Sequence, residues 1–339
     1  MAGFRILGAA VLGLSMLAGG CKIQNDPLYP LDPNGPQDPQ AQQYGPGQLP
    51  PGYVPGQQLG PTFQMPPANM PPVPNDPITN MDMGWLRDAA RGTLTELVAA
   101  LPAEQQARVQ GIPFVTDPKV GEVNAYAACD AQRQPAMAIT DGLLQVQANI
   151  SQLKATDEVF GTQKLDGYLQ ALAQYQKPNQ PILGIPPGYI DARQAADYRK
   201  VFRQHALLEE QLAFVLGHEL AHHYLGHTGC ANGSGGRRQL GYNELSRIFS
   251  RVVPFVNQPN ELAADQAGTI NLLNAGARRQ GIKWNEEGAL LTLYFFAKTE
   301  HAAGSSLFEV FQSSHPDSQN RVAPIQQTAN YWRASGGGR

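Results

Sequence analysis

The segment LGHELAHHYLGH, residues 216–227, contains four of the seven histidines of this 339-residue chain. With the periodicity of an α-helix, His218 and His222 lie one turn apart on the same face, and Glu219 lies beside them. Apolar residues flank the segment, so a helix formed by it is expected to run through the interior. Two imidazoles and a carboxylate are costly to bury without a partner. The segment predicts a buried metal site; the alternative is a chance match on a polar helix face.

A His-Glu-x-x-His spacing is typical of zinc peptidases, whose catalytic metal needs three protein ligands. The metzincin pattern would require histidine where Thr228 stands, and His227 is expected past the helix end. A better third ligand is Glu261 in the segment QPNELAADQAG, with Asp265 one turn later on the same face. Asp265 would accept a hydrogen bond from a histidine ligand and orient it. The alternative for both carboxylates is an acidic first turn favoured by the helix dipole.

The pattern around these motifs is mainly helical from about residue 81. Helices are expected over residues 85–101, from residue 141, and over 192–226, 242–253, 260–274, 285–301 and 316–333. Residues 123–129 and 136–140 are strand-like pieces around a turn. The sequence therefore predicts one α+β domain over residues 81–335, mostly helical, with a small antiparallel sheet beside the histidine helix.

The first 20 residues are typical of an export signal. Arg5 precedes an apolar run over residues 6–17, which is too short to span a bilayer comfortably. Small residues stand directly before Cys21, as in bacterial lipoproteins whose cysteine carries lipid, although Ala18 occupies the usual leucine position. The alternative is an ordinary cleaved signal with an incidental cysteine. Both interpretations predict an exported protein, and lipidation would place it on the periplasmic face of the outer membrane or at the cell surface.

Residues 21–80 are rich in Pro, Gln, Gly and Asn and lack apolar periodicity. Such a segment cannot bury enough apolar surface to offset its ordering entropy, so a disordered tether behind Cys21 is expected. The net charge is −3 and no run of Lys or Arg is present. This charge distribution argues against nucleic acid as a partner.

Four motifs in the same order resemble the gluzincin metallopeptidases related to CAAX prenyl endopeptidase and the heat-shock protease HtpX. They are VNAYAACDAQRQPAMAITDGLL at 123–144, HELAH at 218–222, ELAAD at 261–265 and SSHPDSQNRV at 313–322. Within this family, the chain more closely resembles the soluble periplasmic and lipoprotein branch, which includes the outer-membrane quality-control protease BepA. Tyr126 replaces a common phenylalanine, and Cys129 and Asp130 replace the usual turn residues.

This resemblance implies a zincin-like domain that binds one Zn²⁺ per chain. The implied zinc ligands are His218, His222 and Glu261. Glu219 would be the general base and Asp265 the hydrogen-bonding partner of a histidine ligand.

The implied activity is endopeptidase cleavage of exported or cell-envelope polypeptides, as in protein quality control. His315 is a candidate for stabilising the oxyanion; alternatively, it only precedes a helix that begins at Pro316. The alternative function is a non-catalytic, chaperone-like or assembly lipoprotein that retains the zinc fold. Glu219 argues against that alternative, because a binding module has no need of a general base.

Cys129 and Cys230 form an even pair if Cys21 carries lipid. Disulfides form and persist in the compartments that exported proteins reach. Both segments are expected to flank the cleft in this fold class, which predicts a bridge between them. The alternative is two independent thiols.

Cys21→Ser is expected to move the protein from the membrane fraction to the soluble fraction, because it removes the site of lipid attachment. Cell fractionation and immunoblotting measure this directly. Cys230→Ser, which keeps Cys21, is the control and should remain in the membrane fraction. Membrane retention of Cys21→Ser would contradict the lipid anchor.

Overall fold

The computed structural model describes residues 64–129, 133–177, 179–230, 258–300 and 318–337. The expected signal, most of the tether with Cys21, the expected helix over 242–253, and His315 lie outside these residues. Within the described ranges, no helix is long and apolar enough to cross a membrane.

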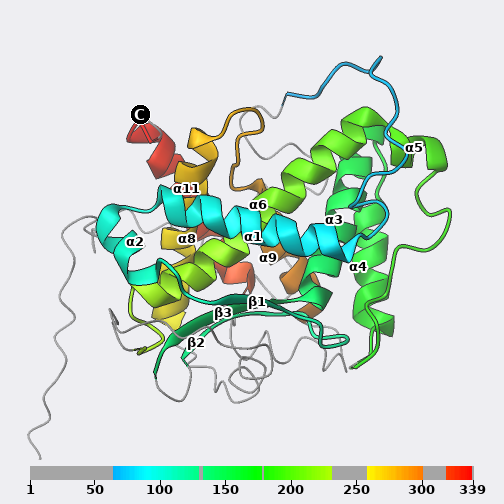
Figure 1. The fold of residues 1–339 in the computed structure, drawn as a ribbon. Coiled ribbons are helices and arrows are strands. Elements are labelled where there is room, and N and C mark those ends of the chain that lie inside the picture. Colours follow the sequence, from blue (N-terminus) through cyan, green and yellow to red (C-terminus); the bar gives the residue numbers. More distant parts are fainter. Residues whose placement is uncertain (1–63, 130–132, 178, 231–257, 301–317, 338–339) are drawn as a thin grey trace, which may run out of the picture. The chain divides into compact units, whose positions relative to one another are not determined.

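The described residues form helices gathered on one side of a three-stranded sheet (Figure 1). The helices are α1 (Met83–Ala100), α2 (Ala103–Val109), α3 (Asp141–Phe160), α4 (Lys164–Tyr175), α5 (Ala192–Ala196), α6 (Tyr198–Tyr224), α8 (Gln258–Arg278), α9 (Glu287–Glu300) and α11 (Ser318–Ala334). The strands are β1 (Phe114–Asp117), β2 (Ala125–Cys129) and β3 (Pro135–Thr140). The expectation of a mostly helical α+β fold is confirmed.

The sheet has the order β1-β3-β2, with β3 in the centre. β2 pairs with β3 in the antiparallel direction, with Ala125 opposite Ile139. β1 pairs with β3 in the parallel direction, with Phe114 opposite Met137. The predicted antiparallel pairing of residues 123–129 with 136–140 is confirmed, whereas the parallel strand β1 was not predicted. Only four residues form β1, which is too short for an alternating pattern, and β3 runs between β1 and β2.

Asp197 divides the single helix expected over residues 192–226 into α5 and α6. Its backbone is extended, with φ of −60° and ψ of 125°, whereas a helical residue has a ψ of about −42°. Its carboxylate accepts a hydrogen bond from the Arg199 N–H at 2.9 Å and so caps α6. The expected helices at residue 141 and over 260–274, 285–301 and 316–333 correspond to α3, α8, α9 and α11. Helix α4 was not predicted.

Helix α6 forms the centre of the domain and packs against α1, α3, α8 and α9. The buried Arg203 of α6 is paired with acidic residues of two neighbouring helices. The buried Arg203 donates to Glu158 of α3 at 2.6 Å and also to Glu287 of α9. Burial raises the pKa of Glu210 well above its usual value even though Arg203 lies nearby. The interior around the first half of α6 is thus polar and contains a buried ion-pair network centred on Arg203.

Helices α6 and α8 approach each other backbone to backbone at two glycines. A Cβ atom on Gly268 of α8 would lie 2.8 Å from the backbone nitrogen of His218. A Cβ atom on Gly217 of α6 would lie 3.2 Å from the backbone oxygen of Gly268. Gly217 directly precedes His218, and Gly268 is three residues beyond Asp265. The close approach therefore occurs at the level of the predicted site residues.

Gly268→Ala is expected to lower the free energy of unfolding by about 1–3 kcal/mol, the usual cost of overpacking an interior. Urea denaturation of the purified protein measures this change. Gly92→Ala is the matched control, because Gly92 is exposed on α1 with nothing within 4 Å of its Cβ position. The control should be neutral or stabilised by about 0.5–1 kcal/mol. Equal stability of the two variants would contradict the close packing of α6 and α8.

Candidate metal centre

Helices α6 and α8 bring together the three predicted metal ligands. The Nε2 atoms of His218 and His222 lie 3.0 Å apart. The carboxylate of Glu261 lies 3.3 Å from each of these Nε2 atoms, one oxygen facing each ring. These three side chains offer ligand atoms that all lie within 4.8 Å of one another. The helical spacing of the histidines and the close approach of α8 together produce this convergence.

The donor set of this cluster suits zinc. Two imidazole nitrogens and one carboxylate oxygen are ligands that zinc prefers, and three protein ligands are typical of catalytic sites. Burial alone would lower the pKa of His218, but the negative charges of Glu261 and Asp265 outweigh burial and raise this pKa to about 10. The cluster therefore favours a positive charge at this position, which a divalent cation would supply.

Asp265 connects the cluster to helix α11. Its Oδ1 lies 2.9 Å from Nδ1 of His218, so the two groups share a hydrogen bond on the side of the ring away from Glu261. Arg321 of α11 donates to both carboxylate oxygens of Asp265 at 2.6 Å. Burial would raise the pKa of Asp265, but Arg321 and His218 outweigh burial and lower it. Asp265 is thus ionised and fixed in a position that orients His218.

Arg321 is a site residue to which the sequence pattern assigned no role. Its Nη1 also lies 3.7 Å from Glu261, so it approaches both carboxylates of α8. The sequence signal for Arg321 is its place in SSHPDSQNRV, one of the four motifs that carry the family resemblance.

Glu219 is buried next to the cluster and lines a small pocket. The pocket is lined by Phe214, Val215, His218, Glu219, Thr292, Leu293, Phe296 and Arg321. Four of these eight residues are apolar, and all of them except Arg321 come from α6 and α9. The proposed general base therefore faces a space between these helices.

His223 and His227 lie outside the set of three converging side chains. His223 Nε2 donates to the Ala136 oxygen of β3 at 3.1 Å, and burial lowers the pKa of His223 to about 4. His223 therefore joins α6 to the sheet as a neutral ring. His227 lies past the end of α6, and its Nδ1 is 3.0 Å from Nδ1 of His222. The sequence did not predict this contact between His227 and His222.

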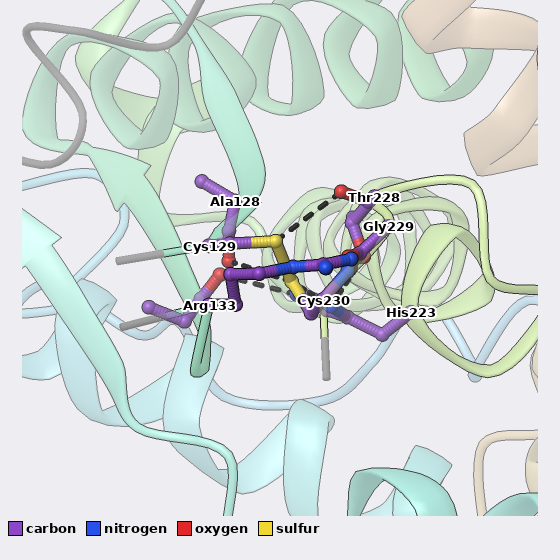
Figure 2. The surroundings of a disulfide bond; sticks show 8 residues. Ala128, Cys129, Arg133, His223, Thr228, Gly229 and Cys230 are labelled. Atoms are coloured by element: carbon purple, nitrogen blue, oxygen red, sulfur yellow. Dashed lines mark hydrogen bonds between the residues drawn. A yellow bond between two sulfur atoms is a disulfide. The ribbon is translucent and has the colours of Figure 1, made fainter. Parts of the chain in front are cut away.

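A disulfide joins Cys129, at the end of β2, to Cys230 in the segment after α6 (Figure 2). The two Cα atoms are 5.4 Å apart, within the range that disulfides require. The bridge links β2, an outer strand of the described sheet, to the segment that follows the histidine helix. Asp130 and His315 lie outside the described residues.

The family model of peptidase family M48 matches residues 90–329. These residues include α6, which carries the two histidines, and α8, which carries Glu261 and Asp265. The chain belongs to peptidase family M48. It is therefore a metallopeptidase by family, and M48 peptidases are typically zinc-dependent. No curated protein and no solved structure matches the chain.

Glu261→Ala is expected to remove most of the bound metal from this M48 peptidase, because it deletes one of three protein ligands. Purified wild type, dialysed against a weak chelator, should retain about one zinc per chain in elemental analysis. Glu104→Ala, at an exposed position of α2, is the control and should retain the wild-type amount. Unchanged zinc in Glu261→Ala would show that the ligands are assigned wrongly.

Proposed function

We propose that this M48 peptidase is a zinc-dependent endopeptidase that hydrolyses peptide bonds in exported or cell-envelope proteins. The observation that carries the proposal is a buried glutamate, Glu219, in the same helical turn as two converging histidines. His218, His222 and Glu261 would hold the zinc. A bound zinc ion supplies Lewis-acid activation of water and of the scissile carbonyl group.

The side chains of this site would divide the proton transfers and the positioning between them. The Glu219 carboxylate would take a proton from the attacking water and return it to the nitrogen of the leaving amine. Asp265 would hold the ring of His218, and Arg321 would hold Asp265 through its two hydrogen bonds.

An extended polypeptide is the substrate that the surroundings of the site favour. β2 is an outer strand of the described sheet, and its end is linked to the segment after α6 by the disulfide. A peptide adding to such a strand would gain main-chain hydrogen bonds without a sequence requirement.

We place this activity in the cell envelope, with the protein anchored through lipid on Cys21 as in the soluble lipoprotein branch of the family. The apolar run and small residues before Cys21 support export. The Cys129–Cys230 bridge also supports it, since disulfides persist in oxidising compartments. A role in degrading misfolded envelope proteins would follow from a main-chain mode of substrate binding.

Glu219→Gln is expected to keep the fold and the zinc but to lower the rate of casein cleavage by about 10²–10⁴-fold, because an amide cannot accept the proton. Fluorescent casein, with zinc content measured on the same samples, provides the assay. Glu209→Gln is the matched control on the same helix, where Glu209 accepts from Trp284 at 3.2 Å, away from the cluster. Equal cleavage by Glu219→Gln and wild type would refute the proposed mechanism.

A further inference from the structure

In both histidines of the metal cluster, one ring nitrogen faces Glu261 and the other contacts a second side chain. In each ring Nε2 lies 3.3 Å from a Glu261 oxygen. In each ring Nδ1 has a different neighbour: Asp265 for His218 at 2.9 Å, and His227 for His222 at 3.0 Å. A histidine that binds a metal through one nitrogen is fixed in its tautomer and orientation by the hydrogen bond that the other nitrogen makes.

The sequence after His222 places His227 beside it by a defined turn. Helix α6 ends at Tyr224, and Gly226 has φ of +81°, a conformation that glycine adopts without steric cost. The Gly226 N–H donates to the His223 oxygen at 3.1 Å, and the His227 N–H donates to the His222 oxygen at 2.9 Å. This pair of bonds is the Schellman motif, in which the residue after the glycine contacts the residue five positions earlier. Here that contact joins His227 to His222.

The segment that carries His227 is held to the sheet three residues later. Cys230 forms the disulfide with Cys129, and Arg133 donates to the Gly229 oxygen (Figure 2). The Thr228 hydroxyl lies 3.4 Å from Nδ1 of His223, whose other nitrogen donates to β3. The turn after α6 is therefore fixed at both ends, by the helix and by β2.

We propose that His227 is a positioning residue for the metal site, accepting a hydrogen bond from Nδ1–H of His222, and that the Cys129–Cys230 bridge holds it there. The inference rests on the proposed metal site. His227 then carries its own proton on Nε2, and the Nε2 lone pair of His222 is directed toward Glu261. His227 contacts the ring nitrogen of His222 that does not face Glu261, so it acts on the site through His222 and is not a fourth ligand.

Competition with a chromogenic chelator, using the full chain, measures the zinc dissociation constant. His227→Ala is expected to weaken zinc binding by about 10–100-fold. His227→Asn should restore most of the affinity, because its Oδ1 can occupy the place of Nδ1 and accept the same hydrogen bond. Leu225→Ala, exposed at the same helix end, is the control and should bind zinc as wild type does. A purely structural role for His227 would not be rescued by Asn.

Two outcomes would overturn this inference. Wild-type zinc affinity in His227→Ala would do so, provided that His222→Ala loses zinc; if His222→Ala also keeps zinc, the metal site itself is wrong. The bridge is tested by replacing Cys129 and Cys230 together with serine. This replacement should weaken zinc binding when His227 is present and have no further effect in the His227→Ala background. An equal loss in both backgrounds would show that the bridge does not act through His227.

Discussion

The backbone contact between α6 and α8 at Gly217 and Gly268 is the constraint on which the site depends. The side chain of a glutamate extends only a short distance from its helix. Glu261 can therefore contact both histidines only if the axes of α6 and α8 are close. A side chain at either glycine would lie within about 3 Å of the opposite backbone and separate them. The glycines that allow the close approach and the residues that would bind the metal thus lie on the same two helices.

Charge balance is the second requirement of this interior. Glu261 and Asp265 are buried carboxylates, and buried charges are stable only when they are paired. Arg321 satisfies Asp265 through two hydrogen bonds, while the raised pKa of His218 shows that Glu261 favours a positive charge beside it. A zinc ion held by the cluster would meet that need. Asp265 therefore links α11 to the metal site, because it contacts both Arg321 and His218.

Local patterns predicted the parts of this structure that depend on neighbours in sequence. Helical periodicity placed His218 and His222 together, and the same spacing placed Glu261 with Asp265. Contacts between distant segments were less predictable: Arg321 meets Asp265 from 56 residues away, and no local pattern indicates which acid it pairs with. The parallel strand β1 was too short to show alternation. The contact of His227 was encoded locally, by Gly226, but it required recognising the turn that ends the helix.

X-ray absorption spectroscopy at the zinc edge tests the central claim most directly, because it reports the ligands of the bound ion in the intact protein. The account predicts two imidazole rings and only nitrogen or oxygen neighbours, at about 2.0–2.2 Å. A sulfur neighbour at about 2.3 Å would instead indicate binding through cysteine. That result, or a spectrum without imidazole scattering, would contradict a site built from His218, His222 and Glu261.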